Sequence, residues 1–154
     1  MRALIQRVTS ASVYVDDSSV GEIGIGLLVL VGITRGDQGH DVEYIVDKTI
    51  NLRIFPDSEG KFDKSVVDVG GSVLLVSQFT LYSNTRKGRR PSFTEAMAPE
   101  EAKGMFDVVT GAFENTGISV QRGIFRSQMQ VKLVNDGPVT IMIDSEDRNR
   151  NRGS

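Results

Sequence analysis

Two six-residue segments of the chain contain side chains and backbone features that could take part in chemistry. Ser77–Tyr82 (SQFTLY) follows an apolar run and presents hydroxyl, amide and aromatic groups in succession. Asn135–Thr140 (NDGPVT) contains a Gly-Pro pair, in which glycine lets backbone approach a ligand closely and proline fixes φ. X-Pro is also the one peptide bond with an accessible cis form, and a cis Gly-Pro would turn both local carbonyl groups in one direction. Such a pair of acceptors could bind a ligand without any side chain.

Both segments also have an interpretation that involves no chemistry. Ser77–Tyr82 is compatible with the ordinary polar edge of a strand. Asn, Asp, Gly and Pro are the common turn residues, so Asn135–Thr140 could be a hairpin between the last two strands. The residue types alone leave these alternatives open.

The chain lacks most of the usual catalytic side chains. Its 154 residues include no Cys and one histidine, His40, which excludes disulfides, thiolate nucleophiles, cysteine-based metal sites and histidine clusters. A serine or threonine nucleophile needs a neighbouring base, and neither Ser-x-x-Lys nor Gly-x-Ser-x-Gly occurs. No phosphate-binding glycine loop or dinucleotide fingerprint is found either. We therefore expect no metal and no cofactor.

Charged residues are segregated along the sequence. The net charge of −2 indicates neither a nucleic-acid nor a membrane partner for the molecule as a whole. The first 85 residues carry 7 basic and 11 acidic side chains, whereas the remainder carries 11 and 9. Four of the basic residues lie within five positions: Arg86, Lys87, Arg89 and Arg90. Such a cluster is either a solvated loop or a phosphate-binding patch.

The N-terminal residues do not have the pattern of a signal peptide, because Arg2 and Arg7 interrupt them. The longest apolar run, 27–31, is far too short to span a bilayer. We therefore expect a cytoplasmic protein with no membrane partner.

Hydrophobic periodicity predicts one α+β domain, mainly β, over residues 1–144. Strands are expected at 3–15, near 21–24, and at 26–33, 72–77, 118–122, 129–134 and 139–143, with helices at 37–52 and from 99 to about 117. Because the strands are not separated by regular helical crossovers, the pattern favours a mostly antiparallel barrel or rolled sheet. The polar residues 145–154 are expected to form a disordered tail.

The two segments and their flanks resemble the D-aminoacyl-tRNA deacylases, also called D-tyrosyl-tRNA(Tyr) deacylases. The similarity extends over nearly the whole chain and includes residues 3–9, 21–24, 26–28, 53–55, 71–82, 90–93 and 129–140. The resemblance implies a homodimeric β-barrel that hydrolyses the ester between a D-amino acid, or mischarged glycine, and the 3′-terminal adenosine of tRNA. This would be a chiral proofreading step in translation quality control.

The same resemblance assigns roles to the second segment. Gly137 and Pro138, joined by a cis bond, would reach into the neighbouring subunit's pocket and present carbonyl oxygens to the amino group and Cα of the substrate. They would leave no room for an L side chain. Arg7 would brace the Gly-Pro pair, and Asn135 would support the pocket.

The first segment would line the pocket. The backbone N–H groups of Ser77, Gln78, Phe79 and Thr80 would stabilise the ester oxyanion, and Phe79 would also contact the terminal adenosine. The remaining implied pocket residues form its wall: Ala102, Phe125 and Met129. The basic cluster at 86–90 directly follows this segment and is the better candidate for RNA contact.

Two mechanisms and a second function stay open. An aminoacyl ester is already reactive and the neighbouring ribose hydroxyl can assist attack, so positioning and oxyanion stabilisation can suffice. Thr80 as nucleophile is the alternative mechanism. The alternative function is a non-catalytic or dual-role nucleic-acid-binding barrel of the same fold, possibly directed at DNA.

The chain departs from the family pattern at two places. The family usually places small residues between Phe125 and Met129, whereas this chain has Arg126 and Ser127, which leaves the shape of the pocket rim open. The tail carries Arg148, Arg150 and Arg152 past the usual end of the barrel, either as a solvated extension or as an auxiliary RNA contact.

Overall fold

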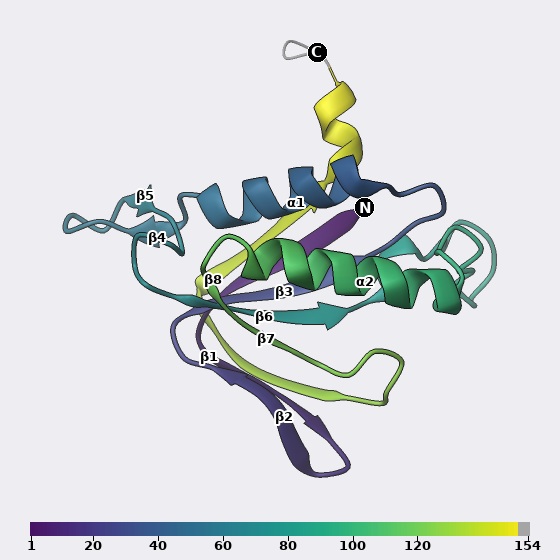
Figure 1. The fold of residues 1–154 in the computed structure, drawn as a ribbon, viewed down its shortest axis with the longest axis horizontal. Helices are drawn as coiled ribbons and strands as arrows, with labels where there is room; N and C mark the ends of the chain where they lie inside the picture. Colours follow the sequence, from purple (N-terminus) through teal and green to yellow (C-terminus); the bar gives the residue numbers. More distant parts are fainter. Residues whose placement is uncertain (151–154) are drawn as a thin grey trace.

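The computed structural model describes residues 1–150, in which two α-helices lie side by side over one face of a strongly curved, six-stranded sheet (Figure 1). The sheet strands are β1 (Arg2–Val15), β2 (Ser18–Ile23), β3 (Gly26–Gly32), β6 (Ser72–Ser77), β7 (Ser119–Arg122) and β8 (Gln130–Asp144). The helices are α1 (Gly39–Asn51) and α2 (Pro99–Glu114), with two short 3-10 helices, η1 (Phe79–Tyr82) and η2 (Ser145–Asn149). A separate hairpin pairs β4 (Phe55–Pro56) with β5 (Phe62–Lys64). The expected α+β class, mainly β, is confirmed.

The long strand β1 organises the sheet. It pairs antiparallel with β8 along one edge and with β3 and then β2 along the other. The pairs β3–β6 and β6–β7 are parallel, and α1 and α2 are the crossovers that connect them. The sequence interpretation recognised both helices but not this role. The sheet is therefore antiparallel around β1 and parallel at its other end.

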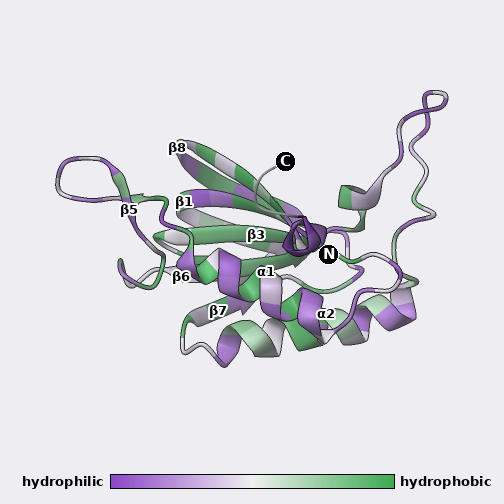
Figure 2. Ribbon diagram, turned by 90° about the horizontal axis from the view of Figure 1, so that it is seen from above, coloured by the Kyte–Doolittle hydropathy of each residue, from purple (hydrophilic) through white to green (hydrophobic). Residues whose placement is uncertain are grey.

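Apolar stripes on both helices bury one face of the sheet, and Figure 2 shows the polar sides of the helices turned outward. Phe106, Val109 and Phe113 of α2 are buried, as the 3.6-residue period predicts. A second, smaller cluster fills the concave side of the curved sheet, around Val13 and Leu74.

The C-terminal part of the chain differs from the sequence expectation in two ways. Residues 129–143 do not form two strands joined by a hairpin turn, because β8 is one continuous strand. Residues 145–149 are not a disordered tail: η2 packs back on α1, where Ser145 donates a hydrogen bond to Asp41 (2.8 Å) and Arg148 pairs with the same carboxylate (2.7 Å). Residues 151–154, which include Arg152, lie outside the described residues.

Within residues 1–150, no helix is both long enough and apolar enough to cross a membrane.

Candidate active site

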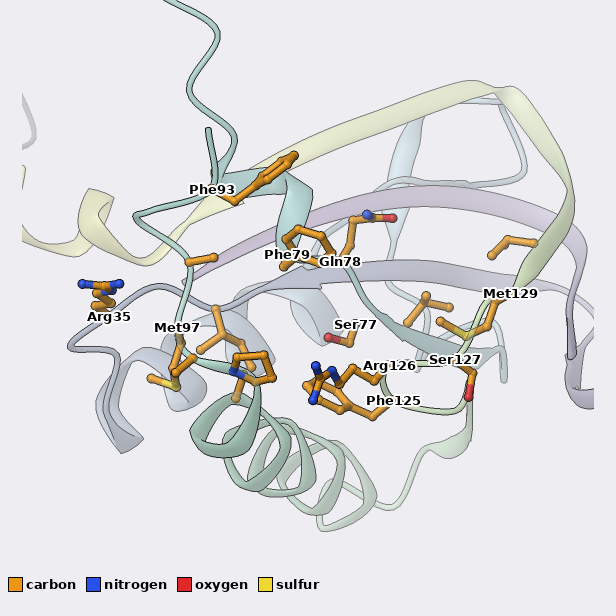
Figure 3. A pocket seen from close by; sticks show the side chains of 17 residues that line it. Arg35, Ser77, Gln78, Phe79, Phe93, Met97, Phe125, Arg126, Ser127 and Met129 are labelled. Atoms are coloured by element: carbon orange, nitrogen blue, oxygen red, sulfur yellow. The ribbon is translucent and has the colours of Figure 1, made fainter. Parts of the chain in front are cut away.

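A cavity of about 740 Å³ opens where β6 ends (Figure 3). It lies between the N-terminal end of α2, the β7–β8 loop and the segment that leads into η1. Six of the residues singled out in the sequence line it: Ser77, Gln78, Phe79, Ala102, Phe125 and Met129. Most of the remaining wall is apolar, so the cavity suits a ligand with a large non-polar surface.

The parallel pairing of β3 and β6 positions the first segment. Ser77 is in register with Val31 of β3, and the Gln78 N–H donates to the Val31 carbonyl (2.8 Å). The strand then stops, and residues 79–82 turn into η1 rather than continuing as a strand edge. This abrupt turn brings the Phe79 ring to the surface, 55% exposed, at the mouth of the cavity.

The start of η1 leaves backbone donors free. In a helical turn the first N–H groups have no acceptor within the turn. Within the described part of the chain, the N–H groups of Phe79 and Thr80 make no hydrogen bond. Phe79 lines the apolar cavity and Thr80 is the next residue in the chain. Unpaired backbone donors at the edge of such a cavity are what an oxyanion site needs.

Thr80 itself is not among the residues that line the cavity. Its hydroxyl accepts a hydrogen bond from the Gln78 side-chain amide. His40 lies on α1 beside Asp41 (3.3 Å), so it is not placed to activate this hydroxyl. Among residues 1–150, no group of His, Cys, Asp and Glu side chains is arranged to hold a metal ion.

The second segment forms a wide bulge inside β8. Gln6 of β1 pairs with Thr140 and Val8 pairs with Asn135, so Arg7 alone faces the four residues between them. Asn135 closes the bulge, because its side chain accepts from the Val139 N–H (3.1 Å) and donates to the Thr140 hydroxyl (3.0 Å). The Gly137–Pro138 bond at its tip is cis, and both residues are exposed.

Arg7 holds this bulge from beneath. Its side chain is buried and donates from Nε to the Asp136 carbonyl (3.1 Å) and from Nη1 to the Ile54 carbonyl (2.7 Å). The guanidinium also lies 5.5 Å from the centre of the Phe62 ring, on the β4–β5 hairpin. One arginine thus links the bulge to the segment around the hairpin.

The bulge and the cavity of the same chain lie apart. Arg7 is level with Leu27 of β3 and hence with Val73 of β6, whereas the cavity begins at Val76, three residues further along. Three residues of strand correspond to about 10 Å. Gly137 and Pro138 are accordingly not among the residues that line the cavity.

The basic cluster lies on a loop that projects from the body of the molecule between η1 and α2 (Figure 2, upper right). Paired backbone hydrogen bonds between Asn84 and Ser92 close its base, and Gly88 (φ +70°) lies at its tip. The four basic side chains are exposed and make no ion pair within residues 1–150: Arg86, Lys87, Arg89 and Arg90. Where this loop returns to the cavity, Phe93 packs edge-on against Phe79 with ring centres 5.0 Å apart.

Sequence reasoning missed some lining residues. Arg35 follows β3, and it lines the cavity because the carboxyl ends of the parallel strands β3 and β6 meet at one edge of the sheet. Recognising that parallel pair would have identified it. Phe93 and Met97 lie in an irregular loop, whose course no periodicity predicts. Arg126 and Ser127, which the sequence analysis named at the pocket rim, also line the cavity.

Comparison with known proteins decides the family. The family model described as D-Tyr-tRNA(Tyr) deacylase matches residues 4–144. The chain belongs to this deacylase family. It is 54% identical to the D-aminoacyl-tRNA deacylase of Desulfitobacterium hafniense (strain Y51), over 95% of this chain and 98% of that protein. It is 55% identical to that of Chloroflexus aurantiacus, over 94% and 91% of the two chains.

Two solved structures share the fold of this deacylase family member. The protein described as c-Myc DNA unwinding element binding protein superimposes with a TM-score of 0.88 at 41% identity, covering 94% of this chain and 98% of the other. A structure described as a probable eukaryotic D-amino acid tRNA deacylase gives a TM-score of 0.79 at 17% identity, covering 92% and 97%. The second likeness concerns the fold alone.

Proposed function

We propose that the protein is a D-aminoacyl-tRNA deacylase. It hydrolyses the ester between a D-amino acid, or mischarged glycine, and the 3′-terminal adenosine of tRNA, and thereby proofreads chirality in translation. Family membership over residues 4–144 supports the reaction class. One observation supports this cavity as the site of the reaction: among the described residues, the backbone N–H groups of Phe79, which lines the cavity, and of the adjacent Thr80 have no hydrogen-bond partner.

In this reaction water adds to the ester carbonyl, the carbonyl oxygen becomes an oxyanion, and the bond to the ribose oxygen then breaks. The free N–H groups of Phe79 and Thr80 would stabilise the oxyanion as charge develops on it. Among residues 1–150, no side chain that lines the cavity is placed as a base, so the neighbouring ribose hydroxyl of the tRNA would assist the attack. The products are the free D-amino acid and tRNA with a free terminal ribose.

The active unit would be a homodimer. Gly137 and Pro138 are exposed and lie outside their own chain's cavity, so a second copy is needed if they are to face the substrate. In that arrangement each Gly-Pro pair would contact the amino group and Cα of an amino acid bound in the other subunit's cavity. A rigid backbone wall rejects an L side chain sterically, which is the selectivity required among abundant L-aminoacyl-tRNAs.

The tRNA end would enter along the side of the cavity that carries the basic loop. Phe79 and Phe93 offer aromatic surface for the terminal adenosine, since bases stack well on aromatic side chains. The four basic residues at 86–90 would contact backbone phosphates of the acceptor end. Because the substrate would be an aminoacyl-tRNA used in translation, we expect the protein to act in the cytoplasm.

The alternative function, a nucleic-acid-binding barrel without catalysis, has one observation in its favour: the name of the c-Myc DNA unwinding element binding protein, which is 41% identical. It is not favoured here. A binding module has no use for an apolar cavity beside free backbone donors, and the basic loop serves tRNA as well as DNA.

One assay tests the proposed function. A single tRNA is charged with D-tyrosine or L-tyrosine, and release of the amino acid is measured with purified protein in the absence of added metal. We expect hydrolysis of the D-ester and survival of the L-ester. Hydrolysis of neither ester, or of both at the same rate, would show that the proposal is wrong.

A further inference from the structure

Arg126 adopts a backbone conformation that its residue type does not favour. Its φ is +66°. Within residues 1–150, the other non-glycine residues with positive φ are Asp16 and Asp17, which form the turn between β1 and β2. Ser127 donates to the Ile124 carbonyl (3.2 Å), so Arg126 is the third residue of a four-residue turn, where a positive φ normally requires glycine. An arginine here destabilises the turn, so a role for its side chain would explain its presence.

The side chain of Arg126 is free to bind a ligand. It lines the cavity, and 69% of its surface is exposed. Within residues 1–150 its acidic partner is Glu100, whose Oε1 lies 4.0 Å from Nη1 of Arg126 and whose side chain is even more exposed. That distance is too long for a hydrogen bond. Figure 3 shows Arg126 on the wall of the cavity opposite Phe93.

The cavity has a second guanidinium and little else that is charged. Arg35 and Arg126 are the only charged residues among the described ones that line it, and the Arg35 side chain makes no hydrogen bond or ion pair within residues 1–150. The acidic groups in the neighbourhood, Glu100 and Glu101 on α2 and Glu95 in the preceding loop, are all exposed. The cavity therefore combines apolar walls with two guanidinium groups, and the one acidic partner among the described residues is the exposed Glu100, 4.0 Å from Arg126.

From these observations we infer that Arg126 binds an oxyanion of the aminoacyl-tRNA inside this cavity. The inference rests on the proposed function for the identity of the substrate. Guanidinium groups pair with planar carboxylates and with phosphates through two parallel hydrogen bonds. An aminoacyl-tRNA offers both: the side-chain carboxylate of D-aspartate or D-glutamate, and the phosphate on the 5′ side of the terminal adenosine.

The two sources predict different specificities. If the oxyanion is the side-chain carboxylate, Arg126 makes this chain select acidic D-amino acids. If it is the phosphate, Arg126 strengthens binding of every aminoacyl-tRNA. The basic loop lies on the other side of the cavity mouth, so the two sets of basic residues do not compete for one group.

Four small analogues separate the sources without requiring hydrolysis. Each is an adenosine with a stable 3′-amide to D-glutamate or to D-glutamine, with or without a 5′-phosphate. Calorimetry measures their affinity for wild type, Arg126→Gly, Arg126→Lys and the control Arg122→Ala, whose arginine pairs with Asp107 outside the cavity. Arg126→Gly restores the usual turn residue, so the fold should be preserved.

We expect Arg126→Gly to weaken one class of anionic analogue by about tenfold, which is typical of a lost charge-assisted hydrogen bond. Arg126→Lys should retain part of this affinity, and Arg122→Ala should behave as wild type. A loss confined to D-glutamate identifies the carboxylate, and a loss confined to the 5′-phosphate identifies the phosphate.

Equal affinities of wild type and Arg126→Gly for all four analogues would overturn the inference. So would an equal loss for all four, including the D-glutamine analogue without phosphate, which has no anionic group, because arginine would then act by packing. If the analogues bind as expected while the tRNA ester is not hydrolysed, the proposed function fails and the anion site stands.

Discussion

Arg7 donates a hydrogen bond from Nε to the carbonyl oxygen of Asp136 (3.1 Å), one residue before the exposed Gly137–Pro138 pair. The same guanidinium donates to the Ile54 carbonyl (2.7 Å), so β1, β8 and the segment leading to β4 meet at one buried side chain. A bulge of four residues inside a strand has few ladder hydrogen bonds of its own. Its shape therefore depends on side-chain hydrogen bonds, those of Arg7 from β1 and those of Asn135 within β8.

Arg7→Lys should disturb this bulge while keeping the charge. Lysine has a single ammonium group and cannot hold two carbonyl groups in the fixed geometry of a guanidinium. We expect kcat/KM for a D-aminoacyl-tRNA to fall about 10- to 100-fold, because misplacing a group that contacts substrate has effects of this size. The free energy of unfolding should fall by about 2 kcal/mol. Steady-state kinetics and urea unfolding measure the two effects.

Arg53→Lys is the matched control for Arg7→Lys. Arg53 pairs with Asp63 on the β4–β5 hairpin but is 66% exposed. Its replacement should leave kcat/KM unchanged. Equal losses in the two variants would show that the hairpin as a whole, and not the contact with Asp136, supports activity.

Gly137→Ala should impair the reaction for a steric reason. The new Cβ would lie 2.8 Å from Cγ2 of Val139 and 3.1 Å from Nη2 of Arg7, and φ at this position is +128°. The bulge must move to relieve these contacts, so we expect kcat/KM to fall about 10- to 100-fold. Gly111→Ala, whose Cβ would meet nothing within 4 Å, should retain activity and gain up to about 1 kcal/mol of stability. Full activity of Gly137→Ala would show that the bulge is not part of the active site.

Mixing two variants tests whether the cavity and the bulge of different subunits act together. Ala102→Phe fills the cavity and Gly137→Ala displaces the bulge, so each homodimer should be inactive. A mixed dimer has one intact cavity facing one intact bulge, and random mixing should restore about a quarter of wild-type activity. Thermal melts check that both variants fold. If activity does not recover after the mixture is unfolded and refolded together, the proposal that two subunits share each active site is wrong.

The sequence predicted the elements well because each has a strong local signal. The alternating pattern at 3–15 gave β1, and Pro99 followed by Glu100 and Glu101 marked the start of α2 correctly. Ser77, Gln78 and Phe79 line one cavity with Ala102, Phe125 and Met129, whereas Thr80 does not, and only the family resemblance, not periodicity, connected residues so far apart.

The errors arose where tertiary contacts override local preference. Asn135–Thr140 has strong turn chemistry, yet β1 continues past it and pairs with both flanks, so the turn residues form a bulge and not a hairpin. Ser145–Asn149 is polar, yet Arg148 and Ser145 find a common acceptor in Asp41, more than 100 residues away in sequence. Neither partner can be identified from a local window of sequence.

Thr80→Ala tests whether a threonine nucleophile is used. The hydroxyl accepts a hydrogen bond from Gln78, does not line the cavity and has no neighbouring base, so we expect kcat/KM to stay within about threefold of wild type. The backbone N–H of residue 80 is preserved in the variant. If activity fell by about a thousandfold or more in Thr80→Ala and returned in Thr80→Ser, the hydroxyl would be the nucleophile.

Salt dependence tests the role of the basic loop. Arg89 is exposed and makes no ion pair within residues 1–150, so a phosphate contact there would release counterions when tRNA binds. Arg89→Ala should weaken binding and reduce the slope of log K against log salt by about 0.7–0.9 per lost contact. Lys48→Ala on α1 removes an equal charge elsewhere, and it should change neither the affinity for tRNA nor the slope. Identical slopes for wild type and Arg89→Ala would exclude the loop from the RNA interface.

Asp144 should make stability depend on pH. Its carboxylate is partly buried, which alone would raise its pKa, but the Glu146 N–H and the Arg2 guanidinium (3.0 Å) hold that pKa below its ordinary value. A pKa that is lower in the folded than in the unfolded chain stabilises the fold above about pH 4 and loses this contribution as the pH falls through the folded value. Arg2 also donates to the Leu81 carbonyl (2.9 Å), so this pair supports η1.

Asp144→Asn should therefore lower the free energy of unfolding by about 1 kcal/mol at pH 7, and the difference from wild type should shrink below about pH 4. Urea titrations at a series of pH values measure this difference. Asp107→Asn, which removes an exposed pair with Arg122, is the control and should change stability little at any pH. A difference between wild type and Asp144→Asn that is as large at pH 3 as at pH 7 would mean that the side chain acts through packing and not through its charge.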